Sequence, residues 1–176
     1  MIETERLILR PYTEADRPAL AEINGHPEVG MWLSGVLTRA ESDAFMDRAT
    51  AHIADHGFGF WGAERKADGR LVGCIGLLVM GEGMPGQGGI EIGWRLHPDV
   101  QGSGFATEGA AACRDWAFET LGAPEVMAIT ADTNVRSQAV MTRIGMTRAP
   151  SRDFDHPRLG PDHPLRRHVF YSMPRP

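Results

Sequence analysis

A short glycine-rich stretch limits most strongly what this chain can fold into. Residues 101–109 read QGSGFATEG, and they follow a segment at residues 90–97, IEIGWRLH, that predicts a β-strand. Residues 104–121 then predict a helix with a face of small apolar side chains: Ala106, Ala110, Cys113 and Ala117. A strand, a glycine turn and a helix N-terminus form an anion-binding unit, because free amides and the helix dipole attract negative charge. The stretch therefore predicts a phosphate-binding loop.

Two common phosphate loops do not fit this stretch. A P-loop needs a lysine after its second glycine, and the single lysine of the chain, Lys66, lies elsewhere. A dinucleotide-binding loop needs three glycines directly after the strand and an acidic residue about 20 residues further on. In this chain Thr107 stands at the third glycine position, HPDV separates strand from loop, and Asp132 comes about 30 residues later.

The rest of the chain predicts alternating short elements. Strands are expected at residues 5–10, 58–65, 71–80, 90–97, 125–132, 146–152 and 168–173, and helices at 14–24, 39–56, 104–121 and 134–144. The order is βααβββαβαββ, with hairpins in the first half and helical crossovers in the second. We therefore expect one α/β (α+β) domain over residues 1–176, with a mixed, mostly antiparallel sheet of about seven strands.

Composition narrows the possible partners and the cellular location. The net charge is −5 and no basic block occurs, so nucleic acid is not expected as a partner. The longest apolar run, residues 72–80, is too short for a membrane span, and no signal-peptide core opens the chain. Cys74 and Cys113 are expected to be buried, reduced thiols of a cytoplasmic protein. His52 and His56 have a zinc-compatible spacing but no third ligand, so we expect solvated helix histidines and no metal.

A resemblance to a known family accounts for the loop. Gln101-x-x-Gly104-x-Ala106 matches the pyrophosphate motif Gln/Arg-x-x-Gly-x-Gly/Ala of the GNAT superfamily of acetyl-CoA-dependent N-acetyltransferases. The sequence resembles the branch of Rim-type ribosomal-protein N-terminal acetyltransferases over nearly its whole length and in the same order. The matching stretches are TERLILRPYTEAD, EIGWRLHPDVQGSGFATEG, NVRSQAVMTRIGM and DFDHP…HPLRRHVFYSM.

The resemblance implies where acetyl-CoA binds. The strand at residues 90–97 is expected to diverge from the next parallel strand, so that the pantetheine arm lies along Trp94, Arg95 and Leu96. A backbone amide near Trp94 would hold the oxyanion. The pyrophosphate would bind at Gln101, Gly102, Ser103, Gly104, Phe105, Ala106 and Thr107.

The implied reaction is direct attack of a neutral amine on the thioester, which needs two proton transfers. Ser137 is the candidate acid for the coenzyme A thiolate, and Asn134 would bind the pantetheine amides or only cap its helix. Glu91 is the candidate base, with a surface carboxylate as the alternative, and similar enzymes often lack a single essential base. His168 and Tyr171 are weaker candidates that lie on opposite strand faces, so at most one is expected in the cleft.

The acceptor is left open by the sequence. Trp32, between the first two helices, is the candidate acceptor-pocket residue, whereas Trp61 is expected in the core. The acceptor is either a protein N-terminus or a small amine such as a polyamine, an amino acid or an aminoglycoside-like compound. A non-catalytic acyl-CoA-binding or sensing module is the alternative function. A homodimer is compatible with the resemblance, and no sequence feature requires one.

Overall fold

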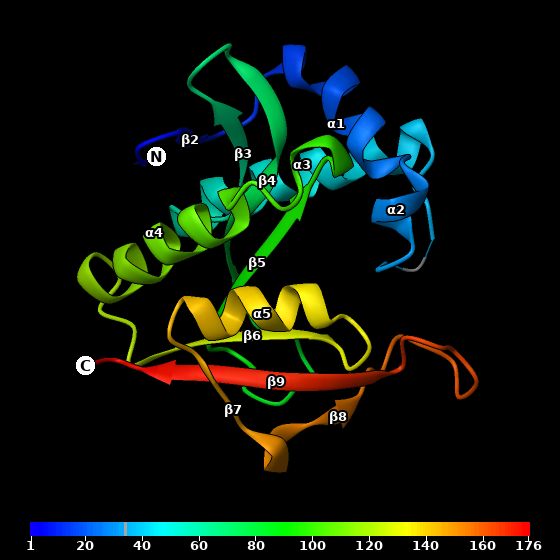
Figure 1. Ribbon diagram of the computed structural model, residues 1–176, viewed down its shortest axis with the longest axis vertical. Helices are drawn as coiled ribbons and strands as arrows, with labels where there is room; N and C mark the ends of the chain where they lie inside the picture. Colours follow the sequence, from blue (N-terminus) through cyan, green and yellow to red (C-terminus); the bar gives the residue numbers. More distant parts are fainter. Residues whose placement is uncertain (34) are drawn as a thin grey trace.

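The computed structural model describes residues 1–33 and 35–176, and its elements follow the expected order with several short additions (Figure 1). The strands are β1 Ile2–Glu3, β2 Leu7–Arg10, β3 Phe60–Arg65, β4 Arg70–Val79, β5 Ile90–Leu96, β6 Glu125–Ala131, β7 Thr147–Arg148, β8 Phe154–Asp155 and β9 Arg167–Pro174. The α-helices are α1 Arg17–Asn24, α2 Pro27–Gly30, α3 Arg39–His56, α4 Phe105–Glu119 and α5 Val135–Arg143. Three 3₁₀ turns are η1 Glu14–Asp16, η2 Pro98–Val100 and η3 Pro150–Arg152.

All strands belong to one mixed, mostly antiparallel sheet. Its order is β1-β2-β3-β4-β5-β6-β9-β7, and β8 pairs with β9. The β5–β6 pair is parallel and the other pairs are antiparallel, which confirms the expected fold class.

The strand count of about seven was too low, because the described residues form nine strands. β1 and β8 have two residues each, too few to show an alternating pattern in sequence. The strand expected at residues 146–152 is also shorter than predicted. It ends at Arg148 because Pro150 begins a 3₁₀ turn.

Helices cover both faces of the first half of the sheet. The apolar face of α4 packs on β4 and β5 through Ala110, Cys113 and Ala117, which are 0% exposed. The opposite face carries α1 and α3, with Leu20, Met46 and Ala49 buried against Leu71 and Cys74. In Figure 1 α4 and α3 accordingly lie on either side of the strands.

The core confirms two expectations about single residues. Trp61 is 1% exposed and meets Trp116 of α4 edge-on, with ring centroids 5.6 Å apart. Cys74 and Cys113 are both buried free thiols.

His52 is not the solvated histidine that the sequence predicted. Its Nδ1 lies 2.8 Å from the carbonyl oxygen of Phe58, and Val79 N donates to its Nε2 at 3.4 Å. The side chain therefore joins the end of α3 to the sheet, while His56 stays exposed.

The two halves of the sheet diverge between β5 and β6. These strands pair only at Ile90 with Val126 and at Glu91 with Met127. Beyond Glu91, β5 continues to pair with β4 on one side, while no strand of the described residues pairs with its other edge. Figure 1 shows β5 running away from β6 at a steep angle. This divergence opens the central cleft of the molecule.

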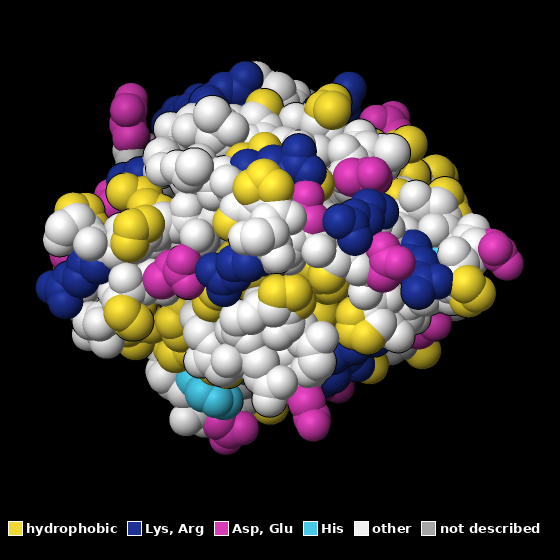
Figure 2. Space-filling view, turned by 90° about the horizontal axis from the view of Figure 1, so that it is seen from below, with side chains coloured by type: hydrophobic (Ala, Val, Ile, Leu, Met, Phe, Trp, Pro, Cys, Tyr) yellow, Lys and Arg dark blue, Asp and Glu magenta, His cyan; other side chains and the backbone are white. Residues whose placement is uncertain are grey.

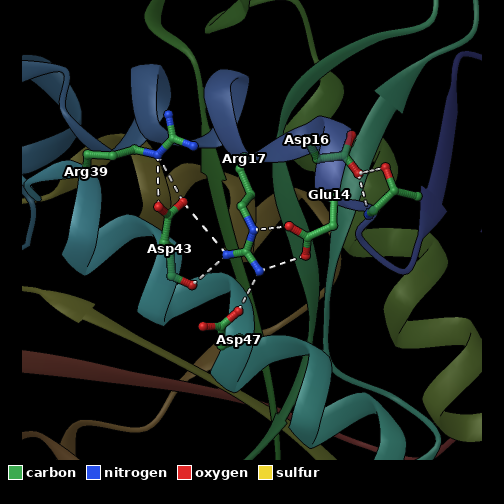
Figure 3. Close-up of polar contacts among 7 residues, drawn as sticks. Glu14, Asp16, Arg17, Arg39, Asp43 and Asp47 are labelled. Carbon is green, nitrogen blue, oxygen red and sulfur yellow. Dashed lines mark hydrogen bonds and ion pairs between the residues drawn. The ribbon is translucent and has the colours of Figure 1, made fainter.

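An ion-pair network joins α1 to α3 (Figure 3). Arg17 donates to Glu14 from Nε at 2.7 Å and to Asp47 from Nη2 at 2.8 Å, and it lies 3.8 Å from Asp43. Arg39 holds Asp43 from the other side at 2.9 Å. The network fixes the helices from which the segment containing α2 projects.

The outer surface mixes charges of both signs. Figure 2 shows Lys and Arg side chains interspersed with Asp and Glu side chains over the face that it presents. Among the described residues, no helix combines the length and apolarity needed to cross a bilayer.

Candidate active site

The diverging strands enclose a cleft of about 1440 Å³. Its walls come from β5 and the N-terminus of α4 on one side and from β6 and α5 on the other. The cleft brings together nearly all residues that the sequence singled out: Trp32, Glu91, Trp94, Arg95, Leu96, Gln101, Gly102, Gly104, Phe105, Ala106, Thr107, Asn134 and Ser137. Ser103 is the exception, because it is exposed and does not line the cleft.

The glycine loop presents free backbone amides to the cleft. Gly102 and Gly104 have φ values of +80° and +87°, a left-handed conformation that glycine adopts without steric cost. No backbone carbonyl of the described residues accepts from the amides of Gly102, Gly104, Phe105, Ala106 or Thr107. Since these amides gather at the N-terminus of a 15-residue helix, they form the expected anion cradle.

Arg6 braces this loop from a segment far away in sequence. It donates from Nη1 to the Ser103 carbonyl oxygen at 3.0 Å and from Nε to Glu108 at 2.6 Å, and its guanidinium lies 4.6 Å from the Phe105 ring centre. Burial opposes ionisation of Glu108, but hydrogen bonds from Thr4 and Arg6 outweigh it and hold the pKa of this carboxyl below its usual value. The sequence carried no sign of this brace, because about 100 residues separate the partners.

The Gln101 side chain supports the loop from the other end. Its Nε2 donates to the Leu96 carbonyl oxygen at 3.1 Å, and its Oε1 accepts from Arg136 of α5 at 3.2 Å. Gln101 thus ties the end of β5 to α5 across the cleft entrance.

Alternation along β5 separates the roles of neighbouring residues. Ile92 and Leu96 are buried against the α4 side, and Trp94 packs against the same cluster. Glu91, Gly93 and Arg95 lie on the opposite face, which we call the acceptor face. Leu96 and Arg95 therefore offer their backbone groups to the cleft edge, while their side chains lie on opposite faces of the strand.

Asn134 and Ser137 stand at the start of α5. The Asn134 Oδ1 accepts from Ser137 N at 3.2 Å, so Asn134 is the N-cap of the helix, and it is 7% exposed. Its Nδ2 and the Ser137 hydroxyl have no hydrogen-bond partner among the described residues, and both residues line the cleft. The Asn134 side chain therefore caps the helix through its oxygen, while its N–H donors stay free to bind a ligand.

Glu91 lies where the two strands begin to diverge. Its carboxyl has no hydrogen bond or ion pair within the part of the chain that the structure describes, and burial raises the pKa of this carboxyl to about 7. Such a carboxyl can exchange a proton near neutral pH.

Two further segments also line the cleft. Trp32 and Glu28 come from the segment after α1, and His168 comes from the start of β9, opposite Ala131. Burial lowers the pKa of His168. Tyr171 does not line the cleft, as expected from alternation; its hydroxyl donates to Gln138 at 3.4 Å.

The geometry suits acetyl-CoA. The free amides match a pyrophosphate, and the unpaired β5 edge matches the amide groups of a pantetheine arm. Arg136 and Arg143 of α5 add positive charge near the loop. Among the described residues no cluster of three His, Cys, Asp or Glu side chains could hold a metal.

Comparison with known proteins agrees with this geometry. Residues 6–147 match the acetyltransferase (GNAT) domain. The uncharacterized N-acetyltransferase YnaD of Bacillus subtilis is 30% identical over 84% of this chain and 82% of its own length. An acetyltransferase from Agrobacterium tumefaciens shares 30% identity with a TM-score of 0.78 over 98% of this chain and 92% of that one. The ribosomal-protein-S5-alanine acetyltransferase of Vibrio fischeri, 15% identical, shares the fold with a TM-score of 0.74, covering 98% and 95% of the two chains.

The fold and these similarities define the chain as an acetyl-CoA-dependent N-acetyltransferase. It belongs to the GNAT family of acetyltransferases.

Proposed function

We propose that this enzyme transfers the acetyl group to a primary amine by direct attack within a ternary complex. The observation that supports this most is the unpaired edge of β5. It leads from the amides of the glycine loop to Glu91, and Ser137 borders the same cleft. A cofactor held along that edge would have its reactive end beside both ionisable candidates.

The chain's own groups would bind and orient the cofactor. The amides from Gly102 to Thr107 would hold the pyrophosphate, and the Asn134 Nδ2 would donate to the arm. A backbone amide near Trp94 would stabilise the oxyanion, a contribution worth about 3–4 kcal/mol where such a donor is lost in other enzymes. Acetyl-CoA itself supplies the activated thioester.

Two residues would carry out the two proton transfers. Glu91 would receive a proton from the amine, directly or through water, because its raised pKa makes it a competent base near neutral pH. Ser137 would donate to the departing thiolate sulfur.

Two acceptor classes fit this chemistry. A protein N-terminus is suggested by the resemblance to Rim-type enzymes and by the name of the Vibrio fischeri neighbour. A small amine fits as well, and Trp32 would form part of either pocket.

Thiol release from acetyl-CoA across a panel of peptides and small amines tests the proposal. Release that depends on an amine, with saturation in both substrates and no acetyl-enzyme, is expected. Binding of coenzyme A without release from any amine would contradict it, and would favour a non-catalytic acyl-CoA-binding module.

A further inference from the structure

Arg95 differs from the other arginines of the chain in its charge environment. Of 17 arginines, 11 form ion pairs among the described residues. Arg95 has no acidic partner within the described part of the chain, yet it is partly buried, whereas the other arginines that form no ion pair there are exposed. Removing a guanidinium from water without a counter-ion is costly, so an uncompensated position of this kind points to a charge supplied by a ligand.

The immediate neighbours of Arg95 are neutral. Its Nη1 donates to Asn24 Oδ1 at 2.5 Å, and its guanidinium lies 4.7 Å from the ring centre of Phe45. The Asn24 Nδ2 in turn donates to Ser42 Oγ at 2.8 Å. An arginine has five N–H donors, and these contacts occupy one of them. The other donors form no hydrogen bond within the described residues, and Arg95 is among the residues that line the cleft.

Arg95 shares the acceptor face of β5 with Glu91. The two residues are four apart, about 13 Å along the strand. Gly93 lies between them, and a Cβ there would come within 2.6 Å of Phe60 Cζ. The Phe60 ring therefore lies over Gly93 and forms an apolar wall between the carboxyl and the guanidinium.

The segment opposite this face is held in place by the same residue that contacts Arg95. Leu37 N donates to the Asn24 carbonyl oxygen at 3.0 Å. This hydrogen bond joins the two ends of the segment that carries Glu28 and Trp32. Asn24, which is 0% exposed, is therefore one buried residue that contacts both the Arg95 side chain and the end of the segment carrying Trp32.

We infer that Arg95 binds a carboxylate carried by the acceptor, so that the substrate class is an amino acid or peptide with both an amine and an acidic group. This inference rests on the proposed function. The amine lies toward Glu91, the apolar part contacts Phe60 and Trp32, and the carboxylate pairs with the guanidinium. Polyamines and aminoglycoside-like polycations are disfavoured, because Arg95 would repel their additional positive charges.

Steady-state kinetics on matched acceptors test this assignment. The panel contains free amino acids, the same amino acids as carboxamides, peptides with an acidic or amide second residue, and a polyamine. We expect wild type to prefer each acid over its amide. Comparison of the free amino acids with the acidic peptides shows whether Arg95 binds a free α-carboxylate or an acidic side chain of a peptide. Arg95→Met should lower the ratio of kcat/KM for the acids to kcat/KM for the amides about 30-fold or more, and so abolish the preference. Arg95→Lys should restore part of it.

A matched control is Arg48→Met, which removes an exposed arginine without an ion pair on α3 and should leave the preference intact. Equal activity of wild type on acids and amides would overturn the inference while the proposed function stands. The inference would also be overturned if Arg95→Met lowered activity equally on all acceptors and lowered thermal stability as well. That result would show that Arg95 has only a structural role, through its contact with Asn24. Absence of thiol release with every amine would remove the proposed function and this inference together.

Discussion

At the scale of single residues, Glu91 makes the clearest prediction. Burial raises the pKa of its carboxyl to about 7, so the ionised base appears only as the pH rises through this value. We expect kcat/KM of wild type to rise across this range and Glu91→Gln to lose that inflection along with most activity. Glu82→Gln, an exposed carboxylate in the β4–β5 connection, is the control. Superimposable pH–rate profiles for Glu91→Gln and wild type would exclude Glu91 as the base.

The same pKa predicts how stability depends on pH. Between about pH 4.5 and 7 the unfolded carboxyl is ionised and the folded one is not, so the free energy of unfolding falls as the pH rises. Glu91→Gln removes the titrating carboxyl, and with it this fall in the free energy of unfolding. We expect the variant to exceed wild type by roughly 2 kcal/mol at pH 8, after allowance for screening by water, and to equal it at pH 4. Chemical denaturation at both pH values measures the difference, and a pH-independent difference would contradict the raised pKa.

Ser137 carries a second prediction at this scale. Its hydroxyl has no partner among the residues that the structure describes, and its backbone amide is bonded to Asn134, so Ser137→Ala removes the proposed proton donor without disturbing the helix cap. We expect kcat to fall about 100-fold, with the KM for acetyl-CoA nearly unchanged. Ser151→Ala, at an exposed serine of η3, serves as the control. Full turnover by a folded Ser137→Ala enzyme would remove the acid assignment.

At the scale of elements, the glycine loop depends on its backbone conformation. Gly104→Ala places a Cβ at φ +87° and 3.2 Å from Arg6 Nη2, which costs about 1–2 kcal/mol and shifts the amides. We expect the KM for acetyl-CoA to rise about tenfold. Gly69→Ala introduces similar strain at φ +69° in the β3–β4 turn, where no atom lies within 4 Å, and should leave the KM unchanged. Equal KM values for the two variants would show that strain alone, and not the cradle, determines the effect.

The contact between α1 and α3 rests on Arg17 (Figure 3). Its side chain is 20% exposed and meets three acids: Glu14, Asp43 and Asp47. Arg17→Met keeps the aliphatic stem and should lower the free energy of unfolding, because networks contribute more than isolated surface pairs. Arg65→Met, which breaks a single pair with Asp68, should cost less. Thermal melts at low and high salt measure both, and a salt-independent loss would argue against an electrostatic origin.

At the scale of the whole molecule, the cleft separates two halves of the sheet that share only two paired positions between β5 and β6. Acetyl-CoA that bridges them should stabilise the fold by about 2.7 kcal/mol at a ligand concentration of 100 times Kd. Hydrogen exchange should slow at the unpaired edge of β5, residues 92–96, as well as in the loop. Protection confined to α4 would contradict binding along the strand.

Much of the architecture was predictable because it depends on near neighbours in sequence. Thr38 with Glu41 forms the expected capping box, and Gly57 ends α3 in the left-handed conformation. The glycine loop, the helix after it and the cap at Asn134 were likewise correct. The errors concern elements that local signals cannot define: two-residue strands that exist only through their partner, and α2, a single turn within a loop.

The sequence by itself determined the order of the longer elements, the glycine loop and the family, because turn chemistry, capping and hydrophobic periodicity act over a few residues. Only the tertiary structure decided how far β6 stays beside β5, which distant arginine braces the loop, and which face of β5 each side chain occupies. The raised pKa of Glu91 and the missing counter-ion of Arg95 also belong to the folded state. Burial and charge pairing depend on what the rest of the chain places around a residue, and no local pattern records that.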